Sequence, residues 1–509
     1  MVRHGLGIAI FSVLSAVSIS LIGCGDSGES VVGIEPFPTS TSTSTAGPTV
    51  DPTVHPTETP TSTTATSILV NDKIYNPTKQ FMDDQKGIYV VQGFVPGGTG
   101  LDDGLCTFKL FKYEAGAGAL GVKAEPTVLD VRLKGGVGDF HLDNPFWVDG
   151  TVDDLGDSDA GNDKLYLAVT DLGSPSAVYL IDMGARSEGW TAGTAINVFE
   201  YGTTSLATSV PLTCSFDSVG CLFWTDYSES TSGGSVKYVT YKDCLEYDSA
   251  RHCGTAVFGL SYPAVIDARG PVAAVSCQGN NQVCLFRAGV AEADLEKCYG
   301  TGLSYENVRY CNYITPEASA SSLLNPFDVK WITALEGDSF SSYLVIDSGL
   351  TMSQYGLASS PDNGGALWIY RYDDDGTYDL TNLRETNPYY GLLLDNLQYP
   401  NSIACTMGAV PGSTSLDIFY CCGGNSVLYN QKGLPGTINV CRYDLMTNRL
   451  VDSYTQVIER DVEDPFGLLI EGYSQASEAV NLVYTTHWNW GGEGKKGEVR
   501  AVRNYVITP

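Results

Sequence analysis

The sequence predicts an all-β fold built from one unit of four short strands that repeats along the chain. The unit is clearest between residues 144 and 201, where Asn-Pro-Phe-Trp-Val opens a first strand and three runs follow: Leu165–Thr170, Ala177–Ile181 and Ile196–Phe199. The runs are rich in β-branched and aromatic residues and are bounded by Gly, Ser, Pro or Asp, which is typical of strands joined by turns. No amphipathic helical period of any length interrupts them.

The opening of this unit recurs along the chain. Prolines 52 to 74 residues apart mark the expected first strands: Pro77, Pro145, Pro211, Pro263, Pro326, Pro400 and Pro465. Because proline has no N–H, it suits the first residue of a strand. Second-strand cores follow at Gly87–Phe94, Leu165–Asp171, Leu222–Asp226, Ala273–Cys277, Tyr343–Asp347, Leu416–Tyr420 and Asn481–Thr486. In four units a glycine opens the third strand, at Gly234–Tyr241, Gly365–Tyr372, Gly436–Tyr443 and Gly497–Arg503.

Repeated antiparallel four-stranded units predict a β-propeller, because a closed ring of blades protects the sheet edges. Seven blades are favoured over six, since the first unit is faint and the unit at 263–325 is irregular. The last unit supplies three strands, and the run Ile68–Val70 is expected to add the fourth, so that an N-terminal strand closes the ring. The alternative is a β-sandwich array whose prolines are spaced by chance.

The residues before the propeller predict export and anchoring. Arg3 and the apolar run Gly5–Ile22 precede Leu21-Ile22-Gly23-Cys24, which resembles the lipobox of bacterial lipoproteins. The resemblance implies that residues 1–23 are a signal peptide and that Cys24 becomes the lipidated N-terminus, in contact with a membrane. Since Gly25 follows it, we expect an outer-membrane lipoprotein of a bacterial cell envelope, on either side of that membrane. The alternatives are an uncleaved anchor and an ordinary secretory signal.

Residues 24–66 are predicted to form a disordered stalk, because the stretch from Pro36 is almost entirely Thr, Ser and Pro. Residues 67–509 then form the propeller.

The net charge of −30, from 29 basic and 59 acidic residues, argues against nucleic acid or an anionic surface as a partner.

The cysteines predict disulfides, as expected for an exported chain. Most lie in close pairs, and Cys106 is the odd one out; those expected to pair are Cys214, Cys221, Cys244, Cys253, Cys277, Cys284, Cys298, Cys311, Cys405, Cys421, Cys422 and Cys441. A metal cluster is the rival interpretation, but the chain has no Cys-x-x-Cys pair and only five histidines.

An acidic loop at residues 153–163 is the candidate cation site. Its alternating carboxylates, Asp157, Asp159 and Asp163 among them, have the spacing at which oxygens converge on Ca²⁺. Gly161 stands where an EF-hand has a carboxylate, so a solvated acidic loop is the favoured interpretation. Calcium is therefore a candidate, and no cofactor is certain.

Several stretches resemble known propeller families. Phe223-Trp224-Thr225-Asp226 resembles the YWTD signature, and the head is weakly similar to YWTD- and NHL-type propellers. Tyr399-Pro400-Asn401 is similar to the Pro-Asn-Gly strand start of gluconolactonase-type propellers, whose Asn binds a metal. Asp464-Pro465-Phe466-Gly467 with His487-Trp488 resembles that family's Pro-Asp-Gly…His-Trp run, although Phe466 replaces the metal-binding Asp. The resemblance implies a calcium-dependent lactonase activity.

Carboxylates also recur where second strands end, at Asp171, Asp226 and Asp347, and we expect them to cap the following turn. Any ligand is expected on the face formed by the loops between second and third strands, which are long and aromatic in the last units. The candidate contacts there are Tyr355, Tyr429, Asn430, His487, Trp488 and Trp490.

No Ser-His-Asp set and no phosphate-cradling loop is found. The favoured function is therefore a non-enzymatic, membrane-anchored module that binds or scaffolds an unknown protein or glycan. The alternative is the calcium-dependent lactonase-type hydrolase.

Replacing Cys24 by Ala is expected to release the protein from the membrane fraction and to abolish acyl labelling, because the thiol is the predicted lipid attachment point. Fractionation and labelled-fatty-acid incorporation measure this, with Cys106→Ala as the matched control. Unchanged detergent partitioning of the Cys24 variant would contradict the lipoprotein assignment.

Overall fold

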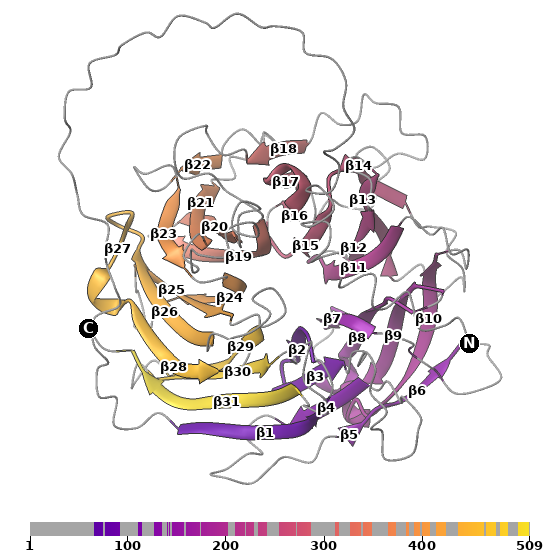
Figure 1. Ribbon diagram of the computed structural model, residues 1–509. Helices are drawn as coiled ribbons and strands as arrows, with labels where there is room; N and C mark the ends of the chain where they lie inside the picture. Colours follow the sequence, from indigo (N-terminus) through magenta and orange to yellow (C-terminus); the bar gives the residue numbers. More distant parts are fainter. Residues whose placement is uncertain are drawn as a thin grey trace, which may run out of the picture.

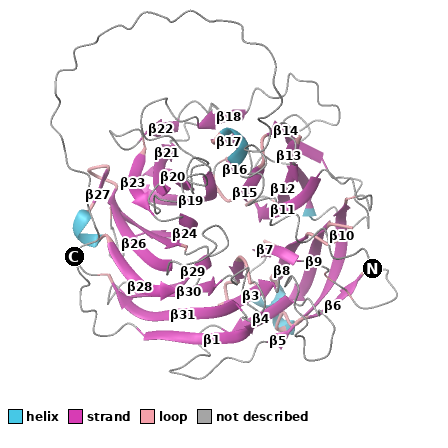
Figure 2. Ribbon diagram, in the orientation of Figure 1, coloured by secondary structure: helices cyan, strands magenta, loops and turns pink. Residues whose placement is uncertain are grey.

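The computed structural model describes residues 66–507 with gaps, the longest being 92–109, 115–126, 242–253, 287–310, 315–325, 349–364, 373–382, 424–435 and 487–496. Seven sheets stand around a central channel (Figure 1). The predicted all-β propeller with seven blades is confirmed, and the blades expected to be faint or irregular are both formed. The helical segments in the described ranges are short 3-10 turns (Figure 2): η1 (Ala160–Asn162), η2 (Arg186–Glu188), η4 (Gln278–Asn280) and η8 (Asp452–Tyr454).

The first four blades follow the chain order. Blade 1 contains β2 (Gln80–Met82), β3 (Gly87–Val91), β4 (Leu110–Glu114) and β5 (Thr127–Val128). Blade 2 contains β7 (Pro145–Asp153), β8 (Lys164–Asp171), β9 (Ala177–Ala185) and β10 (Ala192–Glu200), with β6 (Asp130–Leu133) added in parallel at its outer edge. Blade 3 contains β11 (Ser209–Phe216), β12 (Cys221–Ser228), β13 (Gly234–Thr240) and β14 (Gly254–Leu260). Blade 4 contains β15 (Pro263–Asp267), β16 (Ala273–Cys277), β17 (Gln282–Phe286) and β18 (Cys311–Ile314).

The remaining three blades complete the ring. Blade 5 contains β19 (Pro326–Glu336), β20 (Ser339–Ser348), β21 (Gly365–Tyr372), β22 (Leu383–Glu385) and β23 (Leu392–Leu397). Blade 6 contains β24 (Pro400–Met407), β25 (Ser415–Cys422), β26 (Gly436–Asp444), β27 (Arg449–Leu450) and β28 (Gln456–Val462). Blade 7 contains β29 (Pro465–Ser474), β30 (Ala479–Thr486), β31 (Gly497–Val506) and β1 (Thr66–Ile74).

The ring closes between the two ends of the described chain. β1 pairs antiparallel with β31, and Ile68 lies opposite Ala501. The predicted closing strand is therefore confirmed, and it is longer than the run Ile68–Val70 by which it was predicted. None of the helices in the described part of the chain is long and apolar enough to cross a membrane.

A β-bulge follows the proline of the first strand in blades 2 to 7. In β7 the register shifts between Pro145 and Trp147, and corresponding shifts occur in β11, β15, β19, β24 and β29. A bulge removes backbone groups from the ladder and bends the strand. The polar groups that it releases are buried, so they need partners from elsewhere.

Hydroxyl groups from neighbouring second strands supply several of those partners. Each donates to the carbonyl of the residue after the next blade's proline: Thr170 to Leu212 at 2.9 Å, Thr225 to Ala264 at 3.0 Å, Ser276 to Phe327 at 2.7 Å and Thr485 to Thr78 at 2.8 Å. The bulges and these hydroxyls therefore form the seams between blades.

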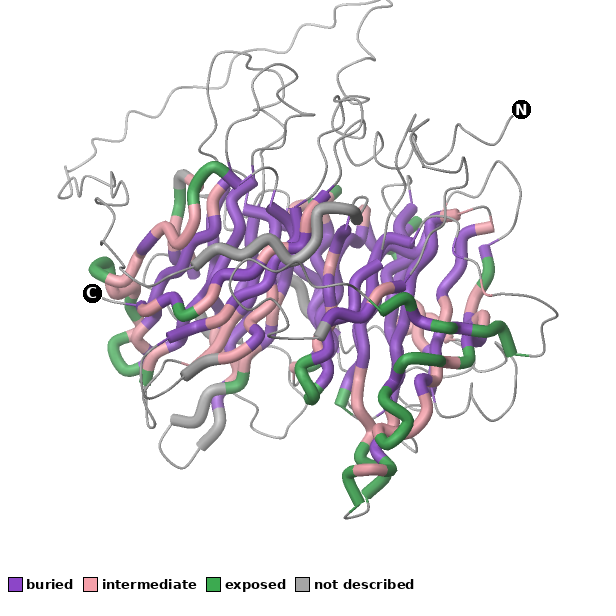
Figure 3. Tube along the Cα trace, turned by 90° about the horizontal axis from the view of Figure 1, so that it is seen from below, coloured by how far each residue is buried: buried purple, intermediate pink, exposed green. Residues whose placement is uncertain are grey.

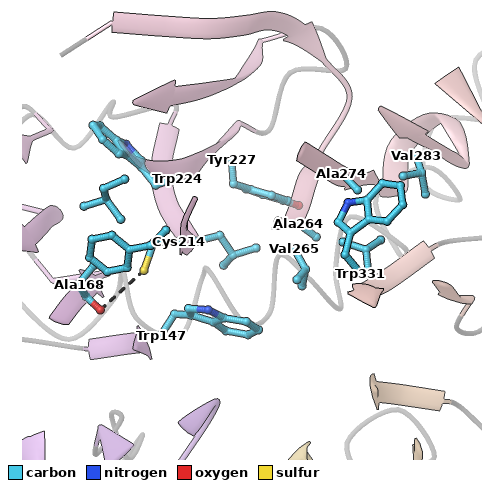
Figure 4. Packing of buried hydrophobic residues seen from close by; sticks show 14 of the residues in the cluster. Trp147, Ala168, Cys214, Trp224, Tyr227, Ala264, Val265, Ala274, Val283 and Trp331 are labelled. Atoms are coloured by element: carbon cyan, nitrogen blue, oxygen red, sulfur yellow. Dashed lines mark hydrogen bonds between the residues drawn. The ribbon is translucent and has the colours of Figure 1, made fainter. Parts of the chain in front are cut away.

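Apolar side chains fill the space between the blades. In a side view the buried residues lie mainly along the strands, and the exposed ones lie mainly toward the ends of the blades (Figure 3). The largest cluster joins blades 2 to 5 and Phe466 of blade 7. It includes Trp147 of blade 2, Trp224 of blade 3 and Trp331 of blade 5 (Figure 4). Smaller clusters fill the seams between blades 1 and 2, 5 and 6, 6 and 7, and 7 and 1, so each seam around the channel has its own apolar packing.

Four seams also depend on a glycine that opens a third strand. A β-carbon built on Gly365 would lie 2.3 Å from Cδ of Pro400, the first residue of the next blade. The corresponding distances are 2.4 Å for Gly234 to Pro263, 2.3 Å for Gly436 to Pro465 and 2.4 Å for Gly497 to Pro77. The glycines and prolines recognised as repeat markers are therefore contact partners across the seams.

The expected disulfides differ from the structure, which has none among its described cysteines. Cys214 and Cys221 belong to different core clusters, because the register of β11 and β12 places them on opposite faces of the blade. Cys277 and Cys284 are diagonal neighbours, since Cys284 lies opposite Val275.

In blade 6, Cys405 and Cys441 both lie opposite Ile418, one strand away on each side, while the vicinal Cys421 and Cys422 point to opposite faces. Cys106, Cys244, Cys253 and Cys298 lie outside the described residues, as does the side chain of Cys311.

Gly436→Ala is expected to lower the free energy of unfolding by about 1–3 kcal/mol, because the added methyl would overpack the seam against Pro465. Gly472→Ala is the matched control, since a β-carbon there would meet nothing within 4 Å. Thermal and urea unfolding midpoints measure the difference. Equal effects of the two substitutions would show that the seams do not depend on these glycines.

Candidate functional site

A cavity of about 580 Å³ lies in the central channel and is lined by the first strands of all seven blades. The lining starts about two residues after the prolines and extends to turns between first and second strands, where Asp84, Lys86 and Arg269 lie. The cavity is therefore on the side of the ring that carries the first-to-second-strand turns.

An ion pair crosses the channel at the inner end of the cavity. Nζ of Lys79, just before β2 of blade 1, lies 3.1 Å from Oδ2 of Asp328 in β19 of blade 5. The same ammonium lies 5.4 Å from the ring centre of Trp147, within the range of a cation–π contact. Because the pair joins blades 1 and 5, which are not neighbours in the ring, it spans the channel.

Two further ion pairs line the wall. Lys330 lies 3.3 Å from Asp267, and Arg269 contacts Asp149 directly and also donates to the carbonyl of Gly150 at 2.9 Å. Burial tends to raise the pKa of Asp267, but Lys330, Arg269 and two backbone N–H donors outweigh it and lower that pKa below its ordinary value. Asp267 therefore stays ionised, and the wall alternates fixed charges of both signs.

The mouth of the cavity adjoins the acidic loop. Arg186 contacts Asp84 of the lining and lies 2.5 Å from Oδ2 of Asp163. Asp159 caps η1 by accepting a hydrogen bond from the Gly161 N–H at 3.0 Å. These carboxylates are engaged in a turn and an ion pair, and in the described ranges no three His, Cys, Asp or Glu side chains could hold a metal ion. Asp157 lies outside those ranges.

The opposite end of the channel is apolar. Phe146, Phe327 and Phe466 each follow a proline, and the rings of Phe327 and Phe466 meet edge to face with centroids 5.9 Å apart. None of the three belongs to the cavity lining. The cavity thus lies on the far side of this aromatic layer from the loops where a ligand was expected, and Tyr355, Tyr429, Asn430, His487, Trp488 and Trp490 lie outside the described residues.

The positions that resemble a gluconolactonase metal site are occupied differently. Asn401 is buried and its amide donates to the carbonyl of Pro465 at 3.0 Å, while its Oδ1 has no partner among the described atoms. Phe466 packs on Phe327 instead of supplying a carboxylate. The described residues therefore do not fit the metal site that the resemblance implies.

Asp347 does not cap a turn in the manner of Asp171, whose Oδ1 accepts the Gly173 N–H at 2.9 Å. Asp171 and Asp226 lie opposite the prolines of their blades, but in blade 5 that position is taken by Ser348. Asp347 is one residue earlier and hence on the other face of its strand. It occupies the place held by the seam hydroxyls of blades 2, 3, 4 and 7.

The carboxyl group of Asp347 is fully buried and accepts the Asp328 N–H at 2.6 Å, while its second oxygen has no described partner. Burial and the adjacent Asp328 carboxylate raise its pKa well above the ordinary value. A neutral Asp347 carries one O–H donor, which is what the hydroxyls provide at the same place in other blades.

Sequence reasoning missed the charged residues of the channel. Lys79, Asp149, Asp267, Asp328 and Lys330 all lie two to four residues after the repeat prolines, within otherwise apolar first strands. The repeat predicts that first strands are innermost in the ring, so charged residues in those strands could have indicated a polar channel. Their pairing was not visible, because Lys79 and Asp328 are 249 residues apart.

No protein-family model and no curated protein matches the chain. Solved structures that resemble it include the WD40 β-propeller domain of Doa1, at 9% identity and a TM-score of 0.39 over 87% of this chain and 98% of that one. The pyranose dehydrogenase PQQ domain from Coprinopsis cinerea aligns at 11% identity and a TM-score of 0.37 over 86% and 95%. A prolyl endopeptidase aligns at 10% identity and a TM-score of 0.35 over 86% of this chain, which spans about half (51%) of that chain. At these values the matches carry no argument about activity.

Asp347→Asn is expected to stabilise the protein at pH 7 to 8, because the amide can accept and donate hydrogen bonds without a buried charge. The pKa of Asp347 is higher in the folded protein than in the unfolded chain, where it is about 4. As pH rises above about 4 the unfolded chain loses this proton before the folded protein does, so the free energy of unfolding of the wild type falls. The gain should therefore shrink as pH is lowered toward 4 in unfolding experiments. An equal gain at both pH values would contradict this account.

Proposed function

We propose that the protein is a binding module of the bacterial cell envelope, in which a propeller head on a lipid-anchored stalk takes a small polar ligand in its central channel. The observation that carries the proposal is the cavity itself. Its volume of about 580 Å³ is within the usual range for small-molecule sites. Residues of all seven blades line it, and apolar side chains alternate there with charged groups that can orient a ligand.

The charged groups support binding because the fold holds them in place. Asp267 accepts the Trp331 N–H at 2.9 Å, Asp149 accepts the Phe216 N–H at 3.1 Å and Asp328 accepts the Ile403 N–H at 2.9 Å. Each of these bonds crosses a seam between blades. The carboxylates, and the cations paired with them, are thus positioned before any ligand arrives, which reduces the entropy lost on binding.

The described lining favours binding over hydrolysis. Burial raises the thiol pKa of both Cys214 and Cys405, so neither is a ready thiolate nucleophile. Ser215 accepts the Ala268 N–H at 3.1 Å, and no histidine belongs to the lining that the structure describes. A hydrolase would need an activated nucleophile or a metal-bound water, and the described residues of the cavity offer neither set.

Thr151→Trp is expected to abolish ligand binding without unfolding the ring, because Thr151 lines the cavity near the end of β7 and an indole there would obstruct it. Thr333→Trp is the matched control, since Thr333 is exposed in the long first strand of blade 5 and outside the lining. Differential scanning fluorimetry against a metabolite and glycan library, followed by calorimetry, measures the effect. Ligands that bind both variants alike would place the site outside the channel.

A further inference from the structure

The carboxylates and the cations of the three ion pairs in the cavity wall differ in how many of their hydrogen-bonding groups are already used. All six carboxylate oxygens of Asp149, Asp267 and Asp328 already accept a donor. Besides the paired cations, these donors are the backbone N–H groups of Phe216, Arg269, Trp331, Val329 and Ile403. The carboxylates are therefore engaged with the wall, and each of their oxygens already has at least one donor.

The paired cations have donors to spare. An ammonium has three N–H groups and a guanidinium five. Lys79 and Lys330 each contact one carboxylate, and Arg269 has two acceptors, Asp149 and the Gly150 carbonyl, so most of their N–H groups have no acceptor among the described residues.

In each of these three pairs the cation is also the more exposed partner. The exposed fractions of the side chains are 40% for Arg269 against 10% for Asp149, 28% for Lys330 against 3% for Asp267, and 14% for Lys79 against 3% for Asp328. All three cations line the cavity. At these three pairs a ligand consequently meets N–H donors first, in a protein whose net charge is −30. At the mouth of the cavity Asp84 is instead the more exposed partner of Arg186.

We propose that this cavity selects small organic ligands that carry an oxyanion group: a carboxylate, a phosphate or a sulfate. The inference rests on the proposed binding function and names the ligand class of the same site. An oxyanion supplies acceptors for the unused N–H groups of these cations, and hydrogen bonds between ionised groups are roughly twice as strong as neutral ones. Apolar residues between the charges, such as Val265, Val329 and Leu468, provide contact for a compact carbon body.

Three sugars that differ mainly in charge test the proposal: glucuronate, glucose and glucosamine. Inorganic sulfate and phosphate serve as minimal anions and distinguish the kinds of oxyanion. Calorimetry on the purified head in about 0.15 M salt, where the Debye length is about 8 Å, limits the effect of the overall negative charge. Glucuronate is expected to bind at least about tenfold more tightly than glucose, and glucosamine more weakly than either.

Two double variants remove one wall ion pair each while keeping hydrogen-bonding groups: Arg269→Gln with Asp149→Asn, and Lys330→Gln with Asp267→Asn. Both are expected to lose the preference for glucuronate over glucose. The matched control is Lys164→Gln with Asp182→Asn, a pair 3.8 Å apart in blade 2 and outside the cavity, which should keep the preference. Using both channel variants keeps the test valid if one of them fails to fold.

The outcomes separate this inference from the proposed function. If glucose binds as tightly as glucuronate, or glucosamine binds most tightly, and Thr151→Trp abolishes that binding, the channel is a ligand site but the oxyanion preference is wrong. If glucuronate, sulfate and phosphate all fail to bind at 10 mM, the oxyanion inference is overturned. If library ligands bind Thr151→Trp and Thr333→Trp alike, the site in the channel is wrong as well.

Discussion

The contact between a glycine that opens one blade's third strand and the proline that opens the next blade's first strand sets how closely neighbouring sheets pack. At Gly365, Gly436 and Gly497 a β-carbon would lie within 2.4 Å of the proline ring. No side chain fits at that distance, so the contact is open only to glycine. Because proline also lacks an N–H, it can begin a first strand without leaving an unpaired donor in the seam.

The bulges after these prolines turn the seams into a polar scaffold. They release buried backbone carbonyls, which accept hydrogen bonds from hydroxyls such as Thr170 and Ser276. Farther along the same first strands, backbone N–H groups donate to carboxylates such as Asp267 and Asp328. Leaving such a group without a partner costs about 1–3 kcal/mol, so these side chains have a structural role first. The charges in the channel follow from that role, since each seam carboxylate also holds a cation over the cavity.

Features that lie within one strand can be predicted from this sequence, whereas contacts between side chains of different blades cannot. The pattern of prolines and glycines located the first and third strands, and the register in the structure agrees with it at Pro145 and Gly365. The same pattern did not show that Asp347 is one residue out of step with Asp171. The second strand of blade 5 continues one residue past its aspartate, to Ser348, and where a strand ends depends on its pairing partner. The disulfide predictions differed from the structure for a related reason. Cys214 and Cys221 are close in sequence, but the pairing of their strands places them on opposite faces.

By itself the sequence determined the class of the fold, the seven repeats and the strand that closes the ring. These are consequences of local chemistry, namely strand propensity, turn residues and the special geometry of proline and glycine, each of which can be read within about ten residues. Tertiary structure alone decided which side chains meet in the channel. The pairs Lys79–Asp328 and Arg269–Asp149 join blades that are far apart along the chain, and only the closure of the ring brings them together. It also decided which end of the channel is polar, because the aromatic layer and the cavity are set by side chains from several blades at once.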